Sequence, residues 1–260
     1  MLQPRIIPCL LVKNKHLVKT VNFKNEKYIG DPINAVRIFN EKEVDELMVL
    51  DIDATSNNEG PDYRMIENLA AECRMPFCYG GGVKTGEQAQ RIIGLGVEKV
   101  AVSSAAVDNP GLVSIIAEQA GSQSIVAVID VKKTLIGGNY EVWTHNGKRC
   151  TGRCPAEFAL QLEKYGVGEI AINSIDNDGM MKGYDLPLVE IIRKAIAVPM
   201  TVLGGAGSLK DIGQLIHKYG IIGAAAGSLF IFKGVYKAVL INYPNRVEKE
   251  TLIRENYRIS

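Results

Sequence analysis

Short apolar runs rich in β-branched residues recur along the chain and alternate with longer amphipathic stretches. Apolar runs of this kind are typical of parallel strands that are buried on both faces and joined by helices. We expect strands at Arg5–Val12, Glu46–Asp53, Pro76–Tyr79, Lys99–Ser103, Ile125–Asp130, Glu169–Ser174, Pro199–Leu203 and Gly223–Ala226. Helical patterns cover Pro32–Asn40, Tyr63–Ala71, Thr85–Leu95 and Leu209–Lys218. Eight such units favour a closed (β/α)8 TIM barrel over an open doubly wound sheet.

The chain also repeats itself, which predicts that the barrel is built from two half-barrels. The segment 78–106 resembles the segment 201–230, CLLVKN (9–14) matches VIDVKK (128–133), and LDID (50–53) is matched with IDND (175–178). We expect one domain over residues 1–260, with half-barrels at about 1–122 and 123–245. The polar tail after Tyr243 is expected to be a peripheral helix or a loose end.

Composition and charge exclude several classes of function. Of the 260 residues 47% are hydrophobic and 23% are charged, and the net charge is +1, so neither nucleic acid nor a membrane is indicated as a partner. The first apolar run is too short for a signal peptide, which predicts a cytoplasmic location. The cysteines (Cys9, Cys73, Cys78, Cys150 and Cys154) are odd in number and are expected to be reduced thiols. No metal site or cofactor is expected.

Two loops have the composition of an anion-binding site. Glycine lets the backbone approach an oxyanion closely, and the free N–H groups at a helix start favour negative charge. Each loop joins glycines after one expected strand to small residues after the next, and the second follows strands seven and eight, where many barrels bind phosphate. The expected phosphate-binding residues are Gly81, Gly82, Ser103 and Ser104 in one half, and Gly205, Ala206, Gly227 and Ser228 in the other.

Catalytic groups of such barrels lie at the C-terminal ends of the strands. Asp130 ends the fifth expected strand and could act as a general acid or base. Its counterpart in the first half is Leu11, which cannot transfer a proton. A duplicated barrel would be expected to carry an acid at both positions, so this asymmetry bears directly on function.

Other polar residues follow the strands. Asp51 and Asp176 are candidates for substrate contact, whereas Asp53 and Asp178 are expected to stabilise turns. Lys19 lies in the segment 13–31, which we interpret as a long polar loop of the size of a lid. There it would either meet an anion or be a solvated lysine.

Charged residues also open four of the expected strands, at the opposite end of the barrel. They are Arg5, Glu46, Lys99 and Glu169. Composition alone favours charges that are merely solvated at strand starts. The alternative is a ring of paired charges that gates the barrel core, since buried charges must be paired.

Together these residues resemble the cyclase subunit of imidazole glycerol phosphate synthase over essentially the whole chain. The matching segments are RIIPCL (5–10), GDP (30–32), DEL (45–47), LDI (50–52), GGGV (80–83), EKV (98–100), GSQ (121–123), SIDNDG (174–179), GYD (183–185), GGAG (204–207) and GS (227–228). The resemblance implies a glutaminase partner at the N-terminal face of the barrel, near Glu98 and Gln123. It implies that ammonia passes the gate of four charges and the barrel core to a bisphosphorylated substrate.

The chain departs from this family at one catalytic position. The two catalytic aspartates of the family fall at Asp130, which is kept, and at Leu11. The pattern resembles a paralogous branch associated with acetamidino modification of surface-polysaccharide sugars. This implies an ammonia-delivering synthase subunit, a nucleotide-linked acetamido sugar and a third, ATP-dependent amidotransferase. The alternatives are a histidine-biosynthesis cyclase and a non-catalytic scaffold that activates the glutaminase.

Overall fold

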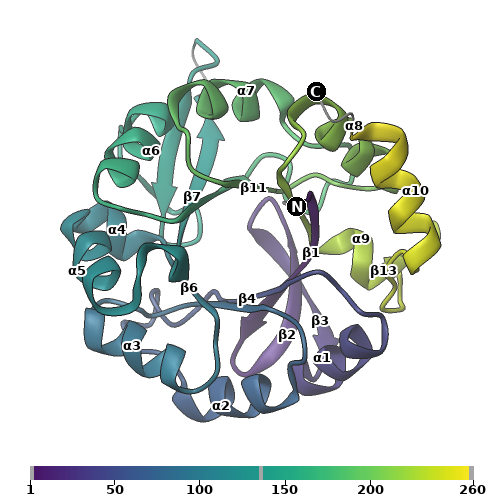
Figure 1. The fold of residues 1–260 in the computed structure, drawn as a ribbon, viewed down its shortest axis with the longest axis horizontal. Helices are drawn as coiled ribbons and strands as arrows, with labels where there is room; N and C mark the ends of the chain where they lie inside the picture. Colours follow the sequence, from purple (N-terminus) through teal and green to yellow (C-terminus); the bar gives the residue numbers. More distant parts are fainter. Residues whose placement is uncertain (1–2, 135–136, 258–260) are drawn as a thin grey trace.

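The computed structural model describes residues 3–134 and 137–257, and eight parallel strands form a closed barrel in it (Figure 1). Around the barrel the strands are β1 (Arg5–Lys13), β4 (Leu47–Asp51), β5 (Phe77–Gly80), β6 (Lys99–Val102), β7 (Ile125–Lys133), β10 (Glu169–Ser174), β11 (Met200–Leu203) and β12 (Gly223–Ala226). Strand β12 pairs with β1 and closes the ring. The prediction of a (β/α)8 TIM barrel is confirmed.

Helices cover the outside of the barrel. They are α1 (Pro32–Glu41), α2 (Tyr63–Glu72), α3 (Gly86–Gly94), α4 (Ser104–Asp108), α5 (Gly111–Ala120), η1 (Ser122–Ser124), α6 (Pro155–Lys164), α7 (Leu186–Ala195), α8 (Leu209–Tyr219), α9 (Ser228–Ile231) and α10 (Arg246–Asn256). Side chains that accept hydrogen bonds from free N–H groups start several of them, as Thr85 and Ser208 do in capping boxes. No helix in the described part of the chain is long and apolar enough to span a membrane.

The alternation of side chains along each strand separates two apolar cores. Residues such as Ile6 and Leu10 of β1 point outward and pack under the helices. Ile7 and Cys9 of the same strand point inward and join a second cluster inside the barrel. Fully burying one such aliphatic side chain contributes about 1.5–3 kcal/mol. The inward-facing residues of the eight strands thus form a packed apolar column inside the barrel.

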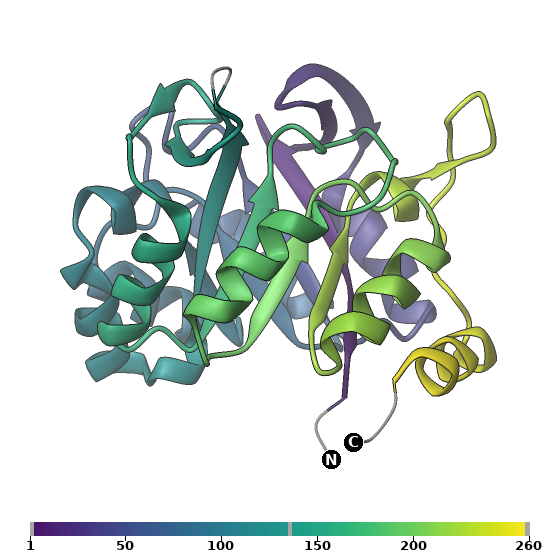
Figure 2. The same cartoon turned by 90° about the horizontal axis from the view of Figure 1, so that it is seen from above.

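Two antiparallel hairpins rise from the C-terminal end of the barrel (Figure 2). The first consists of β2 (His16–Val21) and β3 (Lys24–Gly30), and the second of β8 (Tyr140–Thr144) and β9 (Arg149–Cys150). The interpretation of segment 13–31 as a polar loop was wrong. Asn22 and Phe23 form a two-residue turn with φ of 51° and 59°, the left-handed geometry that favours hairpins.

The strand register corrects one equivalence between the halves. Leu11 is paired with Leu50 across β1 and β4, and Asp130 is paired with Asn173 across β7 and β10. Since Leu11 and Asp130 are counterparts, Leu50 corresponds to Asn173. LDID (50–53) is thus equivalent to NSID (173–176), and the match with IDND was displaced by two residues.

After α9 the chain forms a small hairpin, β13 (Phe232–Lys233) and β14 (Ala238–Val239), and ends in α10. Helix α10 packs on α8, where Leu252 and Asn256 lie against Gly213. In the tail after Tyr243, residues 246–256 thus form a peripheral helix, which lies on the outside of the barrel (Figure 1).

Candidate active site

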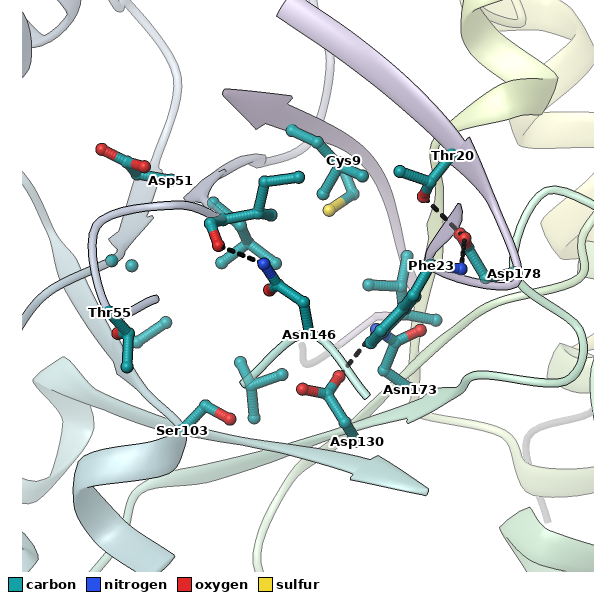
Figure 3. A pocket seen from close by; sticks show the side chains of 18 of the residues that line it. Cys9, Thr20, Phe23, Asp51, Thr55, Ser103, Asp130, Asn146, Asn173 and Asp178 are labelled. Atoms are coloured by element: carbon teal, nitrogen blue, oxygen red, sulfur yellow. Dashed lines mark hydrogen bonds between the residues drawn. The ribbon is translucent and has the colours of Figure 1, made fainter. Parts of the chain in front are cut away.

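A cavity of about 250 Å³ opens at the C-terminal ends of the barrel strands. It is the expected place for chemistry in this fold. Nearly all the residues singled out in the sequence as site residues at this end line it: Leu11, Lys19, Asp51, Gly81, Gly82, Ser103, Ser104, Asp130, Gly205, Ala206, Gly227 and Ser228. Figure 3 shows Asp130, Asn173 and Ser103 around this space.

Asp130 is buried at the mouth of the barrel and is held by one neighbour. Asn173 Nδ2 donates a hydrogen bond to Asp130 Oδ1 at 2.9 Å (Figure 3). Burial raises the pKa of Asp130 to about 7, against the opposing effect of the Asn173 hydrogen bond. A carboxyl group that titrates near neutrality can both give and take a proton.

Leu11 takes the position across the mouth from Asp130. Its strand β1 and the strand β7 that carries Asp130 lie four places apart in a ring of eight. Leu11 and Leu50 are partly buried and pack against the inner apolar cluster. The first half-barrel therefore presents hydrocarbon where the second presents an acid.

The two glycine- and serine-containing loops also oppose one another. One follows β5 and β6 and the other follows β11 and β12, again four places apart around the barrel. At Gly205, with φ of 111°, a side chain would collide with the carbonyl oxygen of Gly183, so the backbone can follow this path only without one. We call the parts of the cavity wall formed by the β5/β6 loops and by the β11/β12 loops the first and the second recess; they lie on opposite walls, with Asp130 on a strand between them.

Lys19 is not a solvated loop residue: it lies on β2, and only 6% of its surface is exposed. Its ammonium donates to the carbonyl oxygen of Cys9 at 2.6 Å. Burial lowers the pKa of Lys19, an effect that the neighbouring Cys9 and Asp178 oppose. A side chain at Gly227 would meet Lys19 Nζ, so this glycine leaves room for the cation beside the second recess.

The two hairpins cross the mouth of the barrel in opposite directions. Each is held to the other half by hydrogen bonds from an asparagine in its turn. Asn22 of the first hairpin donates to the carbonyl oxygens of Ile175 at 3.1 Å and Asp176 at 2.6 Å, in the second half. Asn146 of the second hairpin donates to the carbonyl oxygen of Ile52 at 2.6 Å, in the first half (Figure 3). Ile52 and Ile175 are counterparts in the corrected register. Each half therefore covers the other.

Three of the strand-end acids stabilise backbone turns. Asp53 accepts from Asn14 N at 3.1 Å, and its counterpart Asp176 accepts from Lys133 N at 2.8 Å. Asp178 accepts from Thr20 Oγ1 at 2.7 Å and fixes the first hairpin (Figure 3). Asp176 is not among the lining residues of the cavity.

Asp51 both lines the cavity and accepts weak hydrogen bonds from the backbone N–H groups of Asp53 and Ala54, at 3.3 and 3.2 Å. Burial, and then the nearby Asp53 carboxylate, raise its pKa to about 7. A second acid that titrates near neutrality therefore lies at the mouth.

At the opposite end of the barrel, the four strand-start charges form one closed network. Arg5 binds both Glu46 and Glu169, the latter at 2.7 Å. Lys99 binds Glu46 at 3.1 Å and Glu169 at 2.9 Å. Thr201 donates to Glu169 as well. Burial raises the pKa of Glu169, but the charges of Arg5 and Lys99 outweigh it and hold that pKa at about 2.

Between the network and the cavity, the inward-facing side chains are apolar. The inner cluster contains Ile7, Cys9, Met48, Cys78, Ala101, Val126, Val128, Ala171, Leu203 and Ala225. Burial raises the pKa of the Cys9 thiol to about 11, so it is neutral there. A charged solute would be strongly disfavoured in this column, whereas a small neutral one would not.

The sequence pattern of the histidine biosynthesis protein family matches residues 5–237. The chain belongs to this family. Its members close to this chain include a protein of Leptospira interrogans, 58% identical over 252 residues, which cover 97% of this chain and 99% of the relative. That protein carries a provisional name as the HisF subunit of imidazole glycerol phosphate synthase.

Two further members of the histidine biosynthesis protein family carry related names. A Vibrio vulnificus protein, provisionally named hisF3 of the same synthase, is 56% identical over 250 residues, or 96% of either chain. The HisF subunit of Hyphomonas neptunium is 40% identical over 232 residues, 89% of this chain and 91% of the relative. The chain is thus of the HisF cyclase type. The family and these names support the histidine-biosynthesis alternative better than sugar modification.

Several residues at the mouth of this HisF-type chain were missed in the sequence. Phe23, His145, Asn146, Lys148 and Asn173 all line the cavity. The first four lie on the two hairpin turns, and their signal was the pair of turn-forming segments VNFK and THNG between alternating runs. Asn173 carries no such signal, since one amide in an apolar run gives no spacing to recognise.

The remaining site predictions concern the surface and metals. Glu98 and Gln123 are exposed at the N-terminal ends of β6 and β7, on the side of the charged network. Among the described residues no group of three or more His, Cys, Asp or Glu side chains could hold a metal ion.

Proposed function

We propose that this chain is an ammonia-using synthase subunit of the imidazole glycerol phosphate synthase type. One observation carries the proposal. An acid that titrates near neutrality lies between two opposed glycine- and serine-containing recesses, above an apolar column. Two recesses on opposite walls fit a substrate with an anionic group at each end. A column of apolar side chains suits passage of neutral ammonia but not of ammonium.

The N-terminal face is the docking site of a glutaminase in this proposal. Glu98 and Gln123 are exposed there and are our candidates for the contact. The network of Arg5, Glu46, Lys99 and Glu169 separates that face from the column. Its ion pairs must rearrange before ammonia can enter, and docking of the partner is the event that would change them.

At the mouth, Asp130 is the general acid or base. It would transfer a proton to or from the substrate group whose carbon atom ammonia attacks, while the recesses hold the phosphates and Lys19 supplies a cation near the second recess. Leu11 removes the partner acid. Loss of one general acid commonly costs a factor of about 10²–10⁴ in rate, so ring closure is expected to be slow unless Asp51 substitutes.

A second candidate function follows from Leu11 alone. With one acid missing, the barrel could deliver ammonia for amidine formation on a nucleotide-linked acetamido sugar of a surface polysaccharide. A separate ATP-dependent amidotransferase would then activate the acetamido carbonyl group, because an unactivated amide is a poor electrophile. The anion recesses would serve the diphosphate of the nucleotide.

One experiment separates the two. The purified chain is given the bisphosphorylated cyclase substrate and excess ammonium chloride at alkaline pH, beside a Leu11→Asp variant. Turnover by the unmodified chain supports the histidine-pathway reaction. Turnover by Leu11→Asp alone supports a cyclase site that lacks one acid and moves the search to nucleotide sugars. Turnover by neither contradicts the assignment of the mouth as a cyclase-type site.

A further inference from the structure

Asn173 is hydrogen-bonded to Asp130 and is itself buried. It is 6% exposed, and its Nδ2 donates to Asp130 Oδ1 at 2.9 Å. When Asp130 is ionised, as it is at alkaline pH, this bond fixes the orientation of the amide, since only the NH₂ group can donate to a carboxylate. The other end of the amide, Oδ1, therefore points away from Asp130 (Figure 3).

Asn173 Oδ1 is one of three buried polar side-chain atoms without a hydrogen-bond partner in the described part of the chain. It is buried beside the backbone of Gly204, where an added side chain would approach it to 3.2 Å, and both Asn173 and Gly204 are lining residues of the cavity. Leaving a buried acceptor unsatisfied is costly, so such an atom needs an explanation. A donor that enters the cavity would provide one.

The height of Asn173 in the barrel indicates which donor this is. On β7 and β10, the inward pair Val128 and Ala171 belongs to the apolar column, and the next inward pair is Asp130 and Asn173. These are therefore the first polar side chains that a neutral molecule meets as it leaves the column along these strands. On the opposite wall, Leu11 and Leu50 offer hydrocarbon only.

We propose that Asn173 is a positioning residue for ammonia. Its Oδ1 accepts one N–H of an ammonia molecule, while its Nδ2 holds the Asp130 carboxyl group alongside. One accepted hydrogen leaves the lone pair of the ammonia nitrogen free to attack a substrate in the cavity. The inference rests on the proposed ammonia-using function but adds a residue and an atom to it.

The first test needs no turnover and thus stays valid if the proposed reaction is wrong. In ¹⁵N-labelled protein, the side-chain NH₂ signal of Asn173 is assigned by its loss in Asn173→Leu. Ammonium chloride is titrated at alkaline pH against potassium chloride, with Asn40 and Asn256, which bond backbone carbonyls elsewhere, as internal controls. A saturable shift confined to Asn173 is expected. A shift equal in both salts would mean that water or pH alone acts on the amide, and would overturn the proposal.

The second test uses whichever of the unmodified chain or Leu11→Asp turns over. Asn173→Leu is expected to raise the KM for ammonia roughly tenfold, the effect of one hydrogen bond, and to leave the KM for the phosphorylated substrate within about twofold. Asn173→Ser, which keeps a short acceptor, should recover part of the loss. A raised KM for the phosphorylated substrate with an unchanged KM for ammonia would assign Oδ1 to the substrate and refute the proposal.

Discussion

The charged network at the base of the barrel should contribute stability that depends on pH through Glu169. A carboxyl group whose pKa falls from 4.5 to about 2 on folding contributes about 3 kcal/mol at neutral pH. The Glu169 side chain is only 6% exposed, so solvent screens little of its attraction to the cations of the network. Replacement by its neutral isostere, Glu169→Gln, should therefore cost about 3 kcal/mol at pH 7, within the range of broken buried ion pairs.

The direction in which the stability contribution of Glu169 changes with pH separates an effect of charge from an effect of packing. Because the pKa is depressed in the folded state, the contribution is complete above about pH 4.5 and is lost as pH falls toward 2. The difference between the unmodified chain and Glu169→Gln should narrow by about 2 kcal/mol between pH 7 and pH 3.

Urea unfolding followed by circular dichroism at pH 7, 5, 4 and 3 would measure this difference. Thermal unfolding at pH 7 should show a melting temperature lower by about 6–12 °C. The matched control is Glu72→Gln, which breaks the exposed ion pair with Arg37 and should cost far less stability than Glu169→Gln, because solvent screens an exposed pair. A deficit for Glu169→Gln that stays constant from pH 7 to 3 would refute the reasoning, since it would arise from packing and not from charge.

Three further predictions concern function. Asp130→Asn should lower ammonia-driven turnover by about 10²–10⁴-fold without loss of folding, and the pH profile of the active chain should show a titration near 7 that this variant lacks; a profile that persists would transfer the role to Asp51. Gly227→Ala should weaken binding of the phosphorylated substrate at least several-fold in isothermal titration, because the methyl group would displace Lys19 Nζ, whereas unchanged affinity would contradict the placement of the second recess. Lys99→Ala should change glutamine-driven product formation while docking of the glutaminase persists, measured by coupled assay and by co-elution; unaffected coupling would disprove the conduit and, together with an inert Asp130→Ala, would favour a scaffold.

Much of the barrel could be predicted because its signals are local. A strand such as β10 is an apolar run bounded by turns, and the recess glycines follow directly after their strands. The charged network was harder to predict from the sequence. Arg5 and Glu169 lie 164 residues apart, and nothing in their surroundings shows that they meet. Composition favoured solvated charges, and only the family resemblance indicated a gate.

The hairpins and Lys19 show where prediction from the local sequence failed. The segment HLVKTV contains lysine and threonine, which were interpreted as loop residues, yet four of its six residues are buried. They are buried because the strand pairs with β1 and lies over the mouth, a tertiary effect that overrides polarity. Likewise, Asn173 could not be singled out, since its importance comes from its register with Asp130.

The crossed fastening of the hairpins bears on how such a barrel could have arisen by gene duplication. Asn22 of one half holds the loop after β10, and Asn146 of the other holds the loop after β4. In a dimer of two identical ancestral halves, these same bonds would join two separate chains. Gene fusion would then have required no new contact to cover the mouth of the barrel. The segments 1–122 and 123–245, made as separate chains, should still associate.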